Sequence, residues 1–238
     1  MEKKIRIFLS ETLQENKEIV LDKNQSHYIV NVMRLRVNAE LLAFNGRDGE
    51  FLGKIVDQAK KIIKIYLIKK VRKQTQVKDI TLAFCPLKGT RLDLLIQKCT
   101  EIGVKSFLPI LSDHTINRKI NDERLNKIII ESCEQSDQLS LPILKKIIKF
   151  EEFVSPQTNR ELVLFADINA KINSIENYLS NKNKNITLFI GPEGDFSPKE
   201  RELIKMNNNF KSFSLGGNIL RSETAAISGL VLLNFLLN

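Results

Sequence analysis

The sequence predicts an α/β protein in two parts, a small N-terminal β-barrel followed by a larger domain built on a parallel sheet. In roughly the first third of the chain, short runs that alternate apolar and polar residues are separated by tight turns, as in small barrels. From residue 80 onward, strand-like apolar runs alternate with helical patterns, which is typical of a parallel sheet. Near the C-terminus, two glycine-bearing loops each follow a strand-like run and open a helix.

The N-terminal part is expected to hold one helix and five strands. Ser26 is placed to cap the helix, and Arg34 and Arg36 close it. The residues from Asn45 to Gly49 are turn formers between two of the strands. A polar stretch without apolar periodicity at 71–78 indicates a linker, so the expected domains are 1–74 and 75–238. The expected strands are 5–9, 18–21, 40–44, 50–56 and 61–68.

The charge of the chain is concentrated in this N-terminal part. Of the net charge of +9, a balance of +7 comes from residues 1–75, which carry 16 Lys and Arg against 9 Asp and Glu. Phosphate contacts dominate affinity for nucleic acid, so this part is a candidate polyanion-binding module. A lysine-rich composition that keeps the protein soluble explains the excess about equally well.

The C-terminal part reads as alternating strands and helices. Gly103 is placed to end the first helix, and Asp122 lies in capping range of the second. An apolar and basic crossover is expected at 142–150. The expected strands are 81–85, 104–111, 162–166, 186–190 and 210–215, and the expected helices are 92–102, 123–135, 172–179 and 223–237.

The first loop, residues 191–195, follows an apolar strand and precedes a strong helix start. Ser197 is placed to cap, Pro198 suits the first helical position, and Glu200 completes a capping box. The second loop, residues 215–225, breaks its strand at Gly216 and is expected to start the final helix at a Ser222 cap. Loops that leave the carboxyl ends of parallel strands bind ligands, so these two loops are the candidate site.

The final helix, 223–237, is apolar on nearly every face and needs cover all round. It is shorter than the roughly 20 residues of a membrane span, so we expect the domain core on one side, a second subunit on the other, and no membrane partner. This pattern predicts a homodimer.

Several other classes of protein are disfavoured by the composition. No secretory signal is present, and the three cysteines are odd in number and far apart, which indicates a cytoplasmic protein with buried thiols. The two histidines and the cysteines never fall at ligand spacing, so no metal is expected. The dinucleotide-binding Gly-x-Gly-x-x-Gly and P-loop patterns are both absent.

The sequences GPEGDFSPKE and LGGNILRSETAA resemble the paired signature of the RsmE family of ribosomal RNA methyltransferases, in the SPOUT superfamily. Similar motifs occur around His27, Lys88 and Glu101, and at Glu134-Gln135-Ser136. The resemblance implies a PUA-like N-terminal RNA-binding barrel and a trefoil-knotted domain that binds S-adenosylmethionine; a knot could not be expected from spacing alone. It also implies methylation of N3 of a uridine in 16S ribosomal RNA, with that RNA or the small ribosomal subunit as partner.

Each candidate site residue has an expected role. Arg221, the permanent cation of the second loop, is the candidate catalytic residue for the target nucleotide; an ion pair with Glu193 or Glu223 is its alternative role. Glu193 contacts the cofactor or caps backbone. The candidate cofactor-binding residues are Phe165, Ile190, Gly191, Glu193, Gly194, Leu215, Gly216, Ile219, Leu220 and Thr224, and the candidate RNA-binding residues are Arg34, Arg36, Lys88 and Arg91.

The chain departs from the family pattern in two places. Asp195 stands where the family usually has glycine, and Asp137-Gln138 stands where Gly-Arg normally follows the Glu-Gln-Ser element. His27 and His114 lie outside both loops and are expected to be ordinary surface or hydrogen-bonded histidines. A non-catalytic, dimeric RNA-binding protein is the alternative function, and binding of S-adenosylmethionine would distinguish the two.

Overall fold

The computed structural model describes residues 4–59, 62–155, 162–170, 175–179 and 185–237. Two compact units make up the chain. Unit 1 consists of Met1–Gln76 with Cys133–Leu141, and unit 2 consists of Val77–Ser132 with Pro142–Asn238. The segment 133–141 therefore packs with the N-terminal strands, which no local sequence signal indicates.

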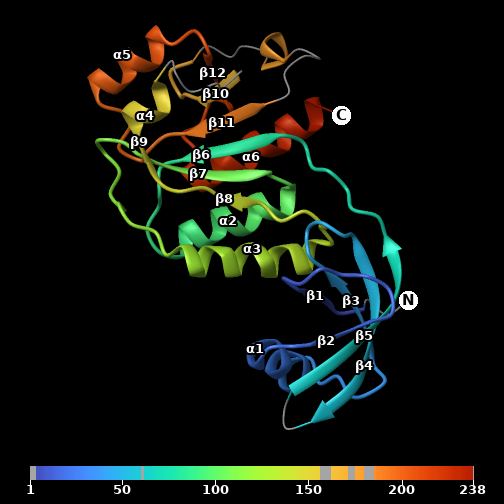
Figure 1. The fold of residues 1–238 in the computed structure, drawn as a ribbon. Helices are drawn as coiled ribbons and strands as arrows, with labels where there is room; N and C mark the ends of the chain where they lie inside the picture. The colour runs from blue at the N-terminus through green and yellow to red at the C-terminus, as the bar shows by residue number, and fades with distance from the viewer. Residues whose placement is uncertain (1–3, 60–61, 156–161, 171–174, 180–184, 238) are drawn as a thin grey trace. The chain divides into compact units, whose positions relative to one another are not determined.

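Unit 1 is built on a five-stranded sheet in the order β1-β3-β4-β5-β2 (Figure 1). β1 runs parallel to β3, and the other neighbouring pairs are antiparallel. Apolar side chains from all five strands and from the helical segment form one core. Closure into a barrel stays a prediction. The strands are β1 (Arg6–Phe8), β2 (Lys17–Val20), β3 (Glu40–Phe44), β4 (Glu50–Ala59) and β5 (Ile62–Arg72).

The helix of unit 1 starts earlier than predicted. α1 (Lys23–His27) is capped by Asp22, which forms a capping box with Gln25, and it continues as the π-helix η1 (Tyr28–Val32). The expected Ser26 cap is wrong: this residue is buried inside the helix, where its hydroxyl accepts a hydrogen bond from the Ile63 amide. Asp22 and Gln25 satisfy two free amides at once, which a lone Ser does not.

A buried arginine connects the two sequence segments of unit 1. Arg6 is 4% exposed, and its Nε donates to Glu50 Oε1 at 2.7 Å. Its guanidinium also donates to the carbonyls of Cys133 and Gln138, at 2.5 and 2.8 Å. Asp137, at the turn of this segment, has a left-handed φ of +65° and accepts a hydrogen bond from Arg72 at 2.9 Å.

Unit 2 contains a parallel sheet in the order β12-β10-β11-β6-β7-β8, with β9 pairing with β7 (Figure 1). The strands are β6 (Ile80–Phe84), β7 (Ser106–Leu111), β8 (Ile143–Leu144), β9 (Ile148–Lys149), β10 (Leu162–Ala166), β11 (Ile186–Ile190) and β12 (Phe210–Phe213). The helices are α2 (Thr90–Ile102), α3 (Asp122–Ser136, of which 133–136 belong to unit 1), α4 (Phe150–Val154), α5 (Pro198–Met206) and α6 (Ser222–Leu236), with the 3₁₀ turn η2 (Ile175–Tyr178). The α/β prediction is confirmed; the knot stays a prediction.

Local signals predicted some ends of these elements and missed others. The capping box of Ser197 and Glu200 and the left-handed Gly103 that ends α2 are confirmed. The Asp122 cap is wrong, because Asp122 lies inside α3 and the Asn121 side chain accepts the Arg124 amide instead. The crossover at 142–150 contains two short strands, and α4 follows it. Part of the expected helix 172–179 lies outside the described residues.

Close packing fixes α6 against β11 and the first loop against a cluster of phenylalanines. A Cβ atom on Gly229 would lie 2.9 Å from a Leu188 methyl, so α6 contacts β11 at a distance that a larger residue would prevent. On the other side, Phe150, Phe165, Phe189 and Phe196 form an aromatic cluster beneath the first loop. Within the described residues, no helix combines the length and apolar character that crossing a bilayer requires.

Candidate functional site

A cavity of about 310 Å³ lies where β10, β11 and β12 end. Three chain segments supply most of its lining: residues 165–168, which we call the β10 segment, the first loop without Gly194 together with Phe196, and residues 214–222 of the second loop region without Gly217. These strands are parallel neighbours, so their carboxyl ends meet at one edge of the sheet. The two loops predicted to share one ligand therefore share one cavity.

The first loop is packed tightly against the aromatic cluster. A Cβ on Gly191 would lie 2.5 Å from the Phe196 ring, so this position accepts only glycine without a shift of the ring. Asp195 has a left-handed φ of +60° and accepts a hydrogen bond from the Phe196 amide at 2.7 Å. The loop thus contributes Gly191, Pro192, Glu193 and Asp195, together with Phe196, to one side of the cavity.

The second loop supplies an apolar surface and a helix start. Gly216 has a φ of +132°, and Ile219 is 84% exposed beside the cavity. The Ser222 cap is wrong by one residue: Arg221 is the N-cap of α6 and makes no side-chain capping bond. The Ser222 hydroxyl instead donates to the Gly191 carbonyl at 3.5 Å, which joins the two loops.

Arg91 connects the first loop to the start of α6. Its Nε and Nη2 donate to the two carboxylate oxygens of Glu223 at 3.0 and 2.5 Å, and its Nη1 forms an ion pair with Glu193. The hydrogen bond from Arg91 lowers the pKa of Glu223 against the opposing effect of burial. The alternative role expected for Arg221 was an ion pair with Glu193 or Glu223. In the structure, Arg91 pairs with both of these carboxylates. In the described parts of the chain, Arg221 makes no ion pair.

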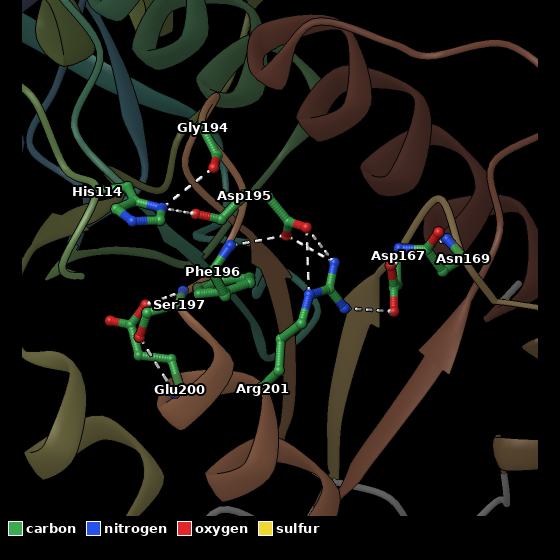
Figure 2. Close-up of polar contacts among 9 residues, drawn as sticks. All are labelled: His114, Asp167, Asn169, Gly194, Asp195, Phe196, Ser197, Glu200 and Arg201. Carbon is green, nitrogen blue, oxygen red and sulfur yellow. Dashed lines mark hydrogen bonds and ion pairs between the residues drawn. The ribbon is translucent and has the colours of Figure 1, made fainter.

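A second arginine connects the first loop to the β10 segment (Figure 2). Nη2 of Arg201 lies 2.6 Å from both carboxylate oxygens of Asp195, and its Nη1 lies 3.4 Å from Asp167 Oδ2. Asp195, Arg201 and Asp167 all line the cavity. The sequence pattern did not indicate Asp167 or Arg201, because neither lies in a glycine-bearing loop.

His114 supports the first loop from outside the cavity lining (Figure 2). Its Nδ1 lies 2.7 Å from the Asp195 carbonyl and 3.1 Å from the Gly194 carbonyl, so Nδ1–H donates to this pair of acceptors. These two hydrogen bonds raise the pKa of His114, the Asp195 bond more strongly, and the carboxylates of Glu200 and Asp113 add to the rise.

The structure brings most of the predicted cofactor residues together. Gly194 and Thr224 do not line the cavity; the Gly194 carbonyl faces His114, and Thr224 is exposed on α6. The predicted residues that line it are Phe165, Ile190, Gly191, Glu193, Leu215, Gly216, Ile219, Leu220 and Arg221, and those that the sequence missed include Asp167, Ile168, Asp195, Phe196, Arg201, Asn218 and Ala225.

The predicted RNA-binding residues fall in both units. Arg34 and Arg36 are exposed on unit 1, and Lys88 is exposed on the loop before α2 in unit 2. Arg91 is half-buried and paired with two carboxylates. Their contact with RNA stays a prediction.

The three cysteines are free and buried, and burial raises the pKa of Cys85 to about 11. A thiol with this pKa is protonated at neutral pH, so Cys85 is a poor nucleophile. Among the described residues, no group of three or more His, Cys, Asp and Glu side chains is placed to hold a metal ion.

Comparison with protein families gives a match in each part of the chain. A model described as an RNA methyltransferase domain matches residues 73–234, and one described as an RNA methyltransferase PUA domain matches residues 21–66. Curated relatives named ribosomal RNA small subunit methyltransferase E are 39% identical in Rickettsia conorii and 32% identical in Buchnera aphidicola. These alignments cover 94% and 93% of this chain, and 93% and 89% of the relatives.

Solved structures resemble the chain over nearly its whole length. A protein from Legionella pneumophila, in complex with bound S-adenosylmethionine, has a TM-score of 0.86 and 28% identity. A ribosomal RNA small subunit methyltransferase E from Neisseria gonorrhoeae, bound to S-adenosylmethionine, has a TM-score of 0.85 at 24% identity, which shows the shared fold. Each comparison covers 98% of both chains.

Proposed function

Because this chain belongs to the family of ribosomal RNA small subunit methyltransferase E proteins, we propose that it uses S-adenosylmethionine to methylate 16S ribosomal RNA. Within that activity, the target that we propose is N3 of one uridine. One observation carries the proposal: the loops 191–195 and 215–225 and the β10 segment line a single cavity at the carboxyl ends of parallel strands.

The residues of the cavity fit the proposed methyl donor. Its volume of about 310 Å³ lies at the lower end of the range of small-molecule sites, roughly 300–1,000 Å³. Phe165, Ile190 and Leu220 offer apolar surface for an adenine ring, and the backbone near Gly191 offers hydrogen-bonding groups to its edge. Carboxylates and guanidiniums in the lining match a donor that carries charges of both signs.

When bound, S-adenosylmethionine supplies an electrophilic methyl group on a sulfonium. The chain has to hold the target nitrogen in line with that group and stabilise the negative charge left when the imide proton departs. We assign the second task to Arg221, which lines the cavity at the start of α6 and, in the described residues, forms no ion pair. Its guanidinium can donate to a nucleotide phosphate or to a uracil carbonyl.

Unit 1 is the proposed RNA-binding module. Its basic charge and the exposed Arg34 and Arg36 suit phosphate binding, and Lys88 offers a further exposed cation on unit 2. Arg91, the fourth predicted RNA-binding residue, would reach phosphate only by giving up its pairs with Glu193 and Glu223. The logarithm of the RNA-binding constant falls linearly with the logarithm of the salt concentration. Replacing Arg34 or Arg36 with Ala should make this slope shallower by about 0.7 to 0.9 for each phosphate that is no longer neutralised.

We also propose that the protein is a homodimer with α6 in its interface. Phe235 and Val231 of this helix are 75% and 52% exposed, although the opposite face is fully buried. Exposed aromatic and branched side chains on one helix are typical of a covered surface. Light scattering on the purified chain tests this, and a monomeric mass at micromolar concentration would contradict it.

Two measurements test the function itself. Isothermal titration with S-adenosylmethionine should give a saturable response, whereas the alternative, a non-catalytic RNA-binding protein, should give none. Nucleoside mass spectrometry of 16S ribosomal RNA from cells that lack the gene should show loss of one N3-methyluridine.

Arg221→Ala should reduce turnover by about 100-fold with donor affinity retained. Normal turnover with only a reduced melting temperature would show that Arg221 supports the fold rather than the reaction.

A further inference from the structure

The Arg201 side chain contacts two of the segments that line the cavity, the first loop and the β10 segment. It comes from α5, outside both glycine-bearing loops, and its guanidinium contacts Asp195 of the first loop and Asp167 of the β10 segment (Figure 2). Arginine suits this task because its planar group presents several donors in a fixed fork. The distance between the two segments is therefore set partly by one guanidinium.

Asp195 needs a partner of this kind. Its φ of +60° lies in the left-handed region, which costs an ordinary residue roughly 1–2 kcal/mol and aspartate somewhat less. The carboxylate offsets this cost by accepting from the Phe196 amide and from Arg201. Such a conformation persists only where surrounding groups fix it, and here those groups are Arg201 on one side and His114 on the other.

The helix that carries Arg201 is itself fixed. Glu200 is buried, accepts from the Ser197 amide at 3.0 Å, and also accepts from the Asp113 amide at 2.8 Å. The Ser197 hydroxyl donates to Asp113 Oδ2 at 2.7 Å. The first turn of α5, which carries Arg201, is therefore hydrogen-bonded to the loop after β7 in the absence of a ligand.

We propose that Arg201 is a positioning residue of the donor site, which orders the first loop by holding Asp195 and Asp167 rather than by touching the donor. This inference rests on the proposed function for the identity of the ligand. Arg201 then contributes to donor affinity by lowering the ordering cost of the loop, because a site already in its bound shape loses less freedom on binding.

A direct role is the competing explanation. Arg201 lines the cavity, and a guanidinium is a good partner for the donor's carboxylate. The two roles differ in how Arg201 and Asp195 depend on one another. If Arg201 acts by positioning, most of its effect disappears once Asp195 is gone and only its hold on Asp167 is left, whereas a residue that touches the donor keeps its full effect.

The test is a double-mutant cycle read by titration with S-adenosylmethionine. Arg201→Gln and Asp195→Gly should each weaken donor binding, by about tenfold and about fivefold, and the double variant should be no weaker than Arg201→Gln by more than about twofold. In the free protein, amides 194–196 should exchange faster with solvent in Arg201→Gln. Arg124→Gln is the matched control, because Arg124 pairs with Asp93 elsewhere on unit 2 and lines no part of the cavity.

Three results would overturn the inference. Effects that multiply, giving about 50-fold in the double variant, would show that Arg201 binds the donor independently. Unchanged donor affinity in Arg201→Gln, or unchanged amide exchange at 194–196, would rule out the positioning role.

If Arg201→Gln does not fold, Arg201→Lys, which keeps the charge without the planar guanidinium, should weaken donor binding by about threefold. Absence of donor binding in the wild-type chain would contradict the proposed function, while the exchange measurement would still test the hold on the loop.

Discussion

Two aspartates in this chain adopt the same uncommon backbone conformation in different surroundings. Asp137 in unit 1 and Asp195 in unit 2 have φ values of +65° and +60°, and an arginine holds each carboxylate. Asp137 lies beside the buried pair of Arg6 and Glu50, whereas Asp195 lies on the wall of a cavity. The first arrangement connects two parts of a core, and the second shapes a space that a ligand can fill.

This contrast shows that the effect of a left-handed aspartate paired with an arginine depends on the residues around it. A left-handed aspartate with an arginine partner fixes a turn in both places. Near Arg6, the fixed turn presents main-chain carbonyls to a buried guanidinium, so the free energy of unfolding should depend on the network. Near Arg201, the fixed turn presents a wall to solvent, so ligand affinity should depend on it.

The largest expected effect is in unit 1. Arg6→Met leaves the buried Glu50 with the Arg72 guanidinium, at 3.4 Å, as its one ion-pair partner in the described part of the chain, and should cost about 3–5 kcal/mol of stability. Amide exchange in β3, β4 and β5 measures this change within unit 1. Adding Glu50→Leu should recover much of it, because no unpaired charge then remains. A cost below about 1 kcal/mol in Arg6→Met would show that the buried pair does not support the core.

The next effect concerns the second bridge of the cavity. Arg91→Met should weaken donor binding by about tenfold, because Glu193 and Glu223 lose the group that joins the first loop to α6. Arg91 also keeps the pKa of Glu223 below its ordinary value of 4.5, so this contribution to stability is present above that pH and is lost as pH falls.

Acid unfolding should show this dependence directly. In Arg91→Met, the midpoint of acid unfolding should move to higher pH, because the stability that Arg91 contributes while Glu223 is ionised is missing. Lys98→Met, which removes the half-buried pair with Glu101 on the same helix, is the control and should leave the midpoint in place. Equal behaviour of the two variants would contradict the role of the bridge.

Matched glycine substitutions compare the two aspartates themselves. Glycine accepts a positive φ, so Asp137→Gly and Asp195→Gly should each change stability by no more than about 1 kcal/mol, as strain and a partly exposed ion pair are removed together. Donor affinity should separate them: Asp195→Gly should weaken it about fivefold and Asp137→Gly should leave it unchanged. The same affinity in both variants would end the distinction between core and cavity.

The smallest effect is a pH dependence that belongs to the first loop. The pKa of His114 is raised in the fold, so its hydrogen bonds contribute most below the unfolded pKa of about 6.5, and the contribution fades as pH rises through the folded value. Protection of amides 194–196 in the wild type should exceed that in His114→Gln at low pH and should approach it at high pH. A difference that grows with pH would contradict this sign.

The sequence predicted the features that depend on neighbouring residues. The apolar strands β10 and β11, the capping box of α5 and Gly103 at the end of α2 follow from local propensity and capping. The predicted caps at Ser26 and Ser222 are wrong, because a serine beside a helical pattern indicates a cap even where another residue takes that position. Such local competition is hard to judge without coordinates.

The site was predicted in part for a similar reason. Glycines and apolar residues in the two loops were visible in the sequence, whereas the pairs of Arg201 with Asp167 and of Arg91 with Glu223 join residues far apart along the chain. Nothing in local spacing marks one arginine as the partner of one carboxylate. Segment 133–141 belongs to unit 1, where Arg6 donates to its carbonyls, and local spacing does not indicate this contact either.

The missing side chain at Gly229 has an effect beyond its own surroundings. Gly229 lies seven positions after Ser222, the first residue of α6, which is roughly 10 Å along the helix axis. A Cβ atom there would lie 2.9 Å from a Leu188 methyl, so a larger residue would require Leu188 or α6 to move, and a displaced α6 would carry Arg221 and Glu223 with it. The positions of Arg221 and Glu223 therefore depend in part on the absence of a side chain about two turns further along α6.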